Sequence, residues 1–235
     1  MTYEEVMRSL EEMGTEQTKK TYLRHGAQEP FFGVKIGDMK KLVKTVKKDQ
    51  DLALSLYESG NHDAMYLAGL TVNPRTMTKE RLQDWVRKAY WHALAEYTVA
   101  GVAAESPYAH ELAVEWIESP DEIIAACGWN VYANYVSMAP DEELDLEEIR
   151  GLLERVRRTI HSERNRVRYV MNNFVISVGA YYDALRVEAK DTAEEVGKVH
   201  VDVGNTACKV PMAYDYIRKI EESGRAGIKK KTCIC

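Results

Sequence analysis

The chain has 235 residues, of which 45% are hydrophobic and 29% charged, and 32 lysines and arginines stand against 37 aspartates and glutamates, a formal net charge of −5. This composition is typical of a soluble globular protein and argues against disorder as the main state. No stretch approaches the about 18 apolar residues of a membrane helix, and the net charge as a whole disfavours a polyanion as the main partner.

Helical periodicity runs through most of the chain, with apolar residues recurring every three or four positions. Thr2 followed by Glu5 forms a capping box, which predicts a helix start at the N-terminus. Farther along, the pattern predicts helices over residues 36–46, 52–57, 64–72, 82–97, 112–117, 124–135, 146–160 and 167–178. Residues 199–203 alternate apolar and polar side chains and lead into Gly204-Asn205, which predicts one short β-strand.

Helices joined by short turns and paired at intervals of about 33–45 residues are typical of an α-solenoid, because each pair has an apolar stripe that only a neighbouring pair can cover. We therefore predict an all-α fold, an α–α superhelix of the ARM/HEAT-like repeat type with a minor β element near 199–203. Residues 1–228 are expected to form a single domain, and residues 229–235 a flexible basic tail. Because no residue pattern recurs strictly, an irregular helical bundle stays open as the alternative.

The charge is distributed unevenly along the chain. Basic residues dominate three runs, 19–48, 150–168 and 218–231, while the acidic residues collect in 105–122 and 141–148. In a solenoid the same helix of each pair lines one concave face, so basic residues of successive repeats can follow a nucleic-acid backbone. The alternative, that these runs are solvated helix surface, stays open.

Arginine suits bidentate phosphate contact, and lysine supplies a point charge. Amides inside an apolar helix need hydrogen-bond partners, which a ligand can provide. The candidate DNA-contacting residues are Lys40, Lys41, Lys44, Arg150, Arg157, Arg158, Arg164, Arg168, Asn172 and Asn173.

The four cysteines show no C-x2-C spacing, and no cluster of metal-ligand type stands out, so we expect no metal and no other cofactor. Cys127 lies among apolar residues and is expected to be a buried, inert thiol. The N-terminus has neither the basic nor the apolar region of a signal peptide. A cytoplasmic location is therefore expected.

Three segments carry a resemblance to a known family. Residues 31–42 read FFGVKIGDMKKL, an aromatic-x-Gly-Val turn that leads into a basic helix; residues 61–68 read NHDAMYLA, and residues 87–91 read RKAYW. In this order they are similar to the DNA alkylation repair family of HEAT-like repeat proteins (the AlkD-like group), and the similarity extends to about residue 182. Residues 197–211 look like a hallmark of one branch of that family.

The resemblance also implies where catalytic groups would lie. Members that excise alkylated purines use an aspartate to stabilise the developing cationic sugar and two tryptophans to cradle the backbone. The first tryptophan falls on Trp91, the aspartate position falls on Ala95, and the second tryptophan falls near Asn173. Alanine carries no charge, and electrostatic stabilisation of this kind is worth several kcal/mol. The resemblance therefore points to a branch that lacks the catalytic aspartate.

We therefore predict a DNA-binding protein that contacts the backbone of double-stranded DNA, including damaged or branched forms, through a basic concave groove and without base excision. The first alternative is an alkylpurine DNA glycosylase that releases 3-methyladenine and 7-methylguanine, with Trp91 and Glu96 as candidate catalytic residues. Glu96 is one position past Ala95, about 100° around a regular helix. The second alternative is a protein-binding helical-repeat scaffold.

Overall fold

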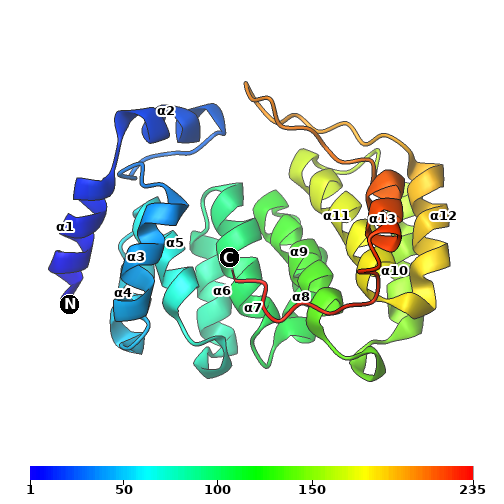
Figure 1. The fold of residues 1–235 in the computed structure, drawn as a ribbon, viewed down its shortest axis with the longest axis horizontal. Coiled ribbons are helices and arrows are strands. Elements are labelled where there is room, and N and C mark those ends of the chain that lie inside the picture. Colours follow the sequence, from blue (N-terminus) through cyan, green and yellow to red (C-terminus); the bar gives the residue numbers. More distant parts are fainter. Residues whose placement is uncertain (235) are drawn as a thin grey trace.

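The computed structural model describes residues 1–234, and these residues form helices and connecting turns without a β-strand (Figure 1). No helix among them combines the length and apolar character required to span a membrane. The helices are α1 (Tyr3–Met13), α2 (Glu16–Arg24), α3 (Ile36–Val46), α4 (Gln50–Glu58), α5 (His62–Thr71), α6 (Lys79–Lys88), α7 (Ala100–Ala104), α8 (Ala109–Ile117), α9 (Glu122–Met138), α10 (Leu146–Thr159), α11 (Asn165–Tyr181), α12 (Arg186–Val196) and α13 (Ala213–Glu222).

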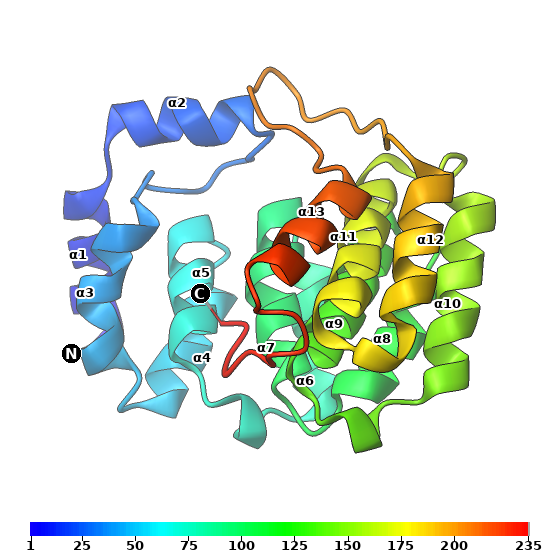
Figure 2. The same cartoon turned by 45° about the vertical axis from the view of Figure 1, so that its right-hand side comes forward.

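From α4 onward the helices stack in two layers (Figure 2). The inner layer runs through α5, the π-helical turn Leu94–Val99 with α7, α9, α11 and α13, each packed against the next, and α4, α6, α8, α10 and α12 form the outer layer. Helices α8 and α9 cross closely, and a Cβ on Gly128 would lie 2.5 Å from the backbone nitrogen of Ile117. The stacked pairs share one continuous apolar core, which confirms the predicted HEAT-like superhelix.

Side-chain caps explain where several helices begin. Thr2 and Glu5 form the predicted capping box of α1. The carboxylates of Asp121 and Asp145 each accept two backbone N–H groups in the first turns of α9 and α10. These interactions satisfy donors that have no partner within their own helix.

The single helix predicted over residues 82–97 is interrupted in the structure. Helix α6 ends at Lys88, and the chain resumes in a π-helical turn, Leu94–Val99, that continues into α7. Between them Tyr90 donates its hydroxyl to the Gly60 carbonyl at 3.1 Å, and Trp91 donates its indole N–H to the His25 carbonyl at 3.1 Å. The two aromatic side chains are held by distant backbone, which diverts the chain from its helical path.

The predicted strand at residues 199–203 was also wrong. The alternation is real, since Val199 is buried and His200 is exposed, but no second strand lies beside it in the part of the chain that the structure describes. A side-chain amide takes that place: Asn165 donates to the Asp202 carbonyl at 2.8 Å and accepts the Asp202 N–H at 2.7 Å. The loop then arches toward α2 (Figure 1), where Gly204 approaches the Arg24 carbonyl.

The basic tail that the sequence analysis expects to be flexible packs against the inner layer in this structure as far as residue 234. The ammonium group of Lys229 donates to the Val136 carbonyl at 2.9 Å, and the Lys230 N–H donates to the Ser137 carbonyl at 2.8 Å. Farther on, the Cys233 N–H donates to a carboxylate oxygen of Glu105 at 2.8 Å. The tail thus crosses the C-terminal ends of α9 and α7.

Candidate nucleic-acid interface

A cleft of about 680 Å³ opens between the N-terminal helices and the start of α11. Its walls come from α2, the first residue of α3, α5, the segment that contains the π-helical turn, the first turns of α11 and the 202–208 loop. The residues that line it include Tyr22, Arg24, His25, His62, Tyr66, Trp91, His92, Tyr97, Asn165, Arg166, Tyr169 and Asp202. Aromatic side chains therefore form a large part of the lining, and Arg24 and Arg166 are its arginines.

The aromatic wall is a packed cluster centred on Trp91. The Trp91 ring lies 5.7 Å from the Tyr22 ring and 4.7 Å from the His62 ring, measured between centroids. Trp91 is buried, whereas Tyr97 at the mouth is 49% exposed. Burial lowers the pKa of His62 to about 4, so its imidazole is neutral near pH 7. The cluster fixes the shape of the cleft, and the exposed ring is placed for stacking.

A buried carboxylate holds the loop before α3, the segment that carries the FFGV sequence. Asp63 accepts three successive backbone N–H groups, from Phe32 at 2.6 Å, Gly33 at 2.9 Å and Val34 at 3.1 Å. Gly33 has a φ of 79°, and a Cβ there would lie 2.5 Å from the Lys19 side chain. Only glycine fits this turn without strain, so the loop presents α3 to the cleft in one orientation.

The strongest electrostatic feature beside the cleft is an ion pair between Glu96 and Arg166. The guanidinium contacts the carboxylate through two hydrogen bonds, of 2.8 and 2.5 Å. The side chain of Glu96 is 1% exposed and that of Arg166 is 15% exposed. Burial raises the pKa of the Glu96 carboxyl, while the hydrogen bonds from Arg166 act in the opposite direction.

The two residues of this pair differ in their position relative to the cleft. Arg166 lines the cleft and Glu96 lies behind it, outside the lining. Ala95 is fully buried, and its carbonyl accepts the thiol of Cys127 at 3.2 Å. Among the described lining residues the one acid is Asp202, and its carboxylate accepts the N–H of Gly204.

The three candidate arginines of α10 lie in the outer layer, away from the cleft lining. Arg150 forms an ion pair with Glu188 of α12 at 3.3 Å. Arg157 donates to the Thr192 hydroxyl at 3.0 Å, also on α12. Arg158 is exposed and pairs with Glu154 one turn earlier on its own helix.

Two other candidate arginines lie around the start of α11 and contact the protein itself. Arg164 donates to the carbonyls of Ser119 and Pro120, at 3.0 and 2.7 Å, and so fixes the turn after α8. Arg168 donates to the side chain of Asn165 at 3.4 Å.

The remaining candidates differ in their relation to the cleft. Asn172 is buried and donates to the Pro211 carbonyl at 3.0 Å, which anchors the 197–212 loop. Asn173 is half-buried and lies four residues after Tyr169, on the same side of α11. Lys40 and Lys44 are exposed on α3 and follow the cleft residue Ile36 at intervals of four; Lys41 is exposed beside them and pairs with Asp38.

Sequence reasoning missed Arg166, because arginines of the run 150–168 were chosen by their position outside the apolar face of a helix and not by the acids that they could pair with. A signal was available: Glu96 interrupts an apolar segment, and a buried carboxylate needs a cationic partner. The sequence does not reveal which of the seven arginines in the run provides it, because 70 residues separate the two.

Comparisons with known proteins agree with this architecture. The family described as DNA alkylation repair enzyme matches residues 6–198. The uncharacterized proteins Lmo0209 of Listeria monocytogenes and Lin0241 of Listeria innocua are each 36% identical over 225 residues, covering 93% of this chain and 97% of theirs. A solved structure with 38% identity and a TM-score of 0.91, covering all of both chains, is described as a new family of proteins related to the HEAT-like repeat DNA glycosylases with affinity for branched DNA structures.

Proposed function

Because this chain belongs to the DNA alkylation repair enzyme family, we propose that it is a DNA-binding protein that contacts the DNA backbone through the cleft of its inner layer, without base excision. The observation that carries the proposal is the replacement of a free carboxylate by an ion pair. Where the resemblance implies a catalytic aspartate there is Ala95, and the neighbouring Glu96 is engaged by Arg166. The carboxylate beside Ala95 is therefore already paired, whereas the glycosylase reaction needs a free anion.

The lining of the cleft supports DNA as the partner. Arg24 supplies a guanidinium group, which suits phosphate oxygens, and Tyr97 and Tyr169 supply ring faces. The exposed Lys40 and Lys44 extend the basic surface from the cleft along α3. Charge on this face is compatible with the net −5, because association depends on the local field at the binding surface.

Branched DNA is the form that we propose this protein prefers. The support is the solved structure of similar sequence and fold, which is described as having affinity for branched DNA structures. A cleft between the N-terminal helices and the start of α11 also suits a junction, where DNA helices diverge from one point. The alkylpurine glycosylase and the protein-binding scaffold become outcomes of the test.

The test is fluorescence anisotropy of a labelled three-way junction and a linear duplex of equal arm length, titrated at several salt concentrations. We expect tighter binding of the junction and a linear fall of log affinity with log salt. Arg24→Glu and the pair Lys40→Glu with Lys44→Glu should each weaken binding and lower the salt slope by about one per lost phosphate contact. Arg81→Glu, a charge reversal at an exposed site on α6 outside the cleft lining, is the matched control.

A parallel assay measures release of methylated purines from alkylated DNA by the wild type and by Glu96→Gln. We expect no release above the protein-free reaction. Base release that depends on Glu96 would establish the glycosylase alternative instead. Binding that is absent at low salt would refute DNA as the partner, and a protein that co-purifies in that case would favour the scaffold.

A further inference from the structure

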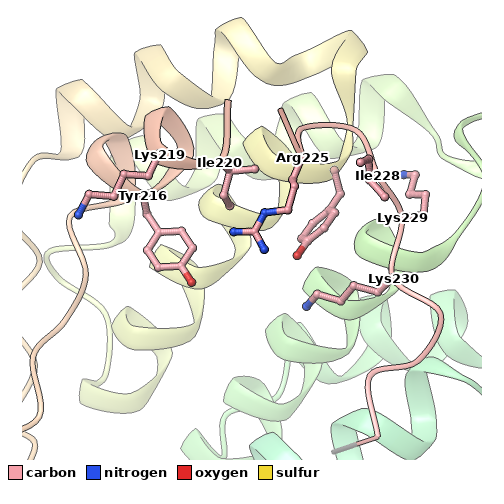
Figure 3. Close-up of a pocket in the computed structure, with 8 residues that line it drawn as sticks. Tyr216, Lys219, Ile220, Arg225, Ile228, Lys229 and Lys230 are labelled. Atoms are coloured by element: carbon pink, nitrogen blue, oxygen red, sulfur yellow. The ribbon is translucent and has the colours of Figure 1, made fainter. Parts of the chain in front are cut away.

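A second pocket, of about 480 Å³, lies at the opposite end of α11 from the cleft (Figure 3). Its lining comes from the end of α11, from α13 and from the segment that follows α13: Tyr181, Tyr216, Lys219, Ile220, Arg225, Ile228, Lys229 and Lys230. The family match ends at residue 198, before α13 begins. Four of the eight lining residues are cationic, and none is acidic.

Close packing of α13 on α11 builds one wall of this pocket. A Cβ on Gly179 would lie 2.5 Å from the side chain of Ile217, so the glycine lets the two helices approach. The chain then turns back, and the Gly227 N–H donates to the Ala180 carbonyl at 2.8 Å. This hydrogen bond places Arg225 on one side of the opening and Lys230 on the other (Figure 3).

Three of the four cations have no acidic partner. Lys229 pairs with Asp141 at 2.9 Å. Lys219, Arg225 and Lys230 form no ion pair with any acid among residues 1–234. Three unpaired cations around one opening concentrate positive potential there.

Exposed rings and apolar groups accompany the charge. Tyr216 is 49% exposed and Ile228 is 61% exposed. The ammonium group of Lys230 lies 5.1 Å from the centre of the Tyr181 ring. Figure 3 shows the guanidinium of Arg225 directed toward Tyr216. Cations beside an accessible aromatic face suit a ligand that carries phosphate next to a sugar or base.

We propose that this pocket binds the phosphate backbone of a second arm of a branched DNA, whose first arm occupies the cleft. The inference rests on the proposed function. Tyr169 at the cleft and Tyr181 at the pocket are 12 residues apart on α11, which is about 18 Å along the helix axis. That separation equals the rise of about five base pairs, so two arms that diverge from a junction can each reach one site.

A purely structural role for the same cations makes a different prediction. Helices α11 and α13 both end at this pocket, and cations stabilise the negative end of a helix dipole. If that were their only role, removing them would lower the thermal stability and leave DNA affinity unchanged. Thermal unfolding is therefore measured beside binding for every variant.

The test compares Arg225→Glu with Lys230→Glu, as a double variant, with the wild type on the three-way junction and on the linear duplex. Arg75→Glu with Arg81→Glu is the matched control, because it changes the net charge equally at exposed sites outside both pockets. Arg225→Gln with Lys230→Gln is a milder variant that serves if the charge reversal unfolds the protein. We expect the reversal to weaken junction binding at low salt by about tenfold or more and to lower the salt slope by about two. Duplex binding should match that of the control.

Each other outcome overturns the proposal. Equal losses on the junction and the duplex would place the pocket on the path of one arm. Junction affinity no lower than that of the control, with or without a fall in thermal stability, would leave the cations with a structural role. In both cases the wild type still binds DNA, whereas failure of the proposed function would abolish DNA binding by the wild type itself.

Discussion

The ion pair between Glu96 and Arg166 makes a prediction that tests the interpretation of the cleft. Arg166→Met keeps much of the side-chain volume and removes the guanidinium. In this variant the carboxylate of Glu96, whose side chain is 1% exposed, stays buried without its cationic partner. Removing one partner of a buried pair costs about 3–5 kcal/mol, because the remaining charge is uncompensated. For a chain of this size that corresponds to a fall in Tm of about 6–20 °C.

The loss of unfolding free energy in Arg166→Met should depend on pH in a defined direction. Burial already raises the pKa of Glu96, and the Arg166 hydrogen bonds that act against this effect are absent in the variant. A carboxyl whose folded-state pKa lies above its unfolded value stabilises the fold while it is protonated, and this contribution is lost as the pH rises through the folded pKa. The stability difference between Arg166→Met and the wild type should therefore be larger at about pH 8 than at about pH 5.

Urea unfolding of the two single variants and the double variant measures the coupling directly. Glu96→Gln leaves Arg166 at the edge of the cleft, where it is 15% exposed and can reach water. This variant should therefore lose less unfolding free energy than Arg166→Met. Arg166→Met with Glu96→Leu should recover most of the stability, since an apolar pair replaces an ionic one. A loss under about 1 kcal/mol for Arg166→Met at neutral pH would show that Glu96 does not depend on this cation.

Three further predictions concern the frame around the cleft. Burial lowers the pKa of His62 from 6.5 to about 4, so the stability that the neutral imidazole provides above pH 6.5 should be lost as the pH falls. In the wild type this lowers the free energy of unfolding between pH 7 and pH 5. His62→Gln should make that decrease smaller by about 2 kcal/mol. Asp63→Ala leaves three backbone N–H groups without their acceptor and should cost about 3 kcal/mol or more in urea unfolding, whereas Asp63→Asn, which keeps one oxygen, should cost less. Gly128→Ala places a Cβ 2.5 Å from the backbone of Ile117 and should lower the free energy of unfolding by about 1–3 kcal/mol. Gly151→Ala has no neighbouring atom within 4 Å and should stabilise α10 by about 0.5–1 kcal/mol. A similar Tm for these two variants would contradict the packing described between α8 and α9.

The superhelix could be predicted from the sequence because its information is local. Apolar residues at intervals of three and four mark each helix, and short turns favour the packing of neighbouring helices against each other. Each helix predicted between residues 36 and 178 corresponds to helical structure, apart from the interruption at residues 89–91. That interruption depends on hydrogen bonds from Tyr90 and Trp91 to carbonyls about 30 and 66 residues away, which no local pattern contains.

The candidate site was less predictable, because it depends on which cation faces which acid across the fold. The arginines of α10 read as a basic run, yet Arg150 and Arg157 contact α12, whose residues are more than 30 positions later. Net charge along a segment therefore describes composition, and only the packing decides whether a guanidinium meets a carboxylate or solvent. The same reasoning explains why three cations at the C-terminal pocket stay unpaired although Glu221 and Glu222 are close in sequence: those two acids pair with Lys190 and Arg218.

The π-helical turn explains why the adjacent residues Ala95 and Glu96 have different environments. A π turn holds more residues than an α turn, so the 100° step that separates Ala95 from Glu96 in a regular helix does not apply within Leu94–Val99. Two carbonyls of this turn accept side-chain groups of α9: the Ala95 carbonyl, which also accepts the Ala100 N–H, accepts the thiol of Cys127, and the Glu96 carbonyl accepts the amide of Asn130. These contacts fix Ala95 inside the core and direct Glu96 toward α11, where Arg166 neutralises it. Restoring a carboxylate by Ala95→Asp would therefore bury a second acid beside Cys127 rather than present one to DNA, so we expect that variant to lose stability and to gain no base release.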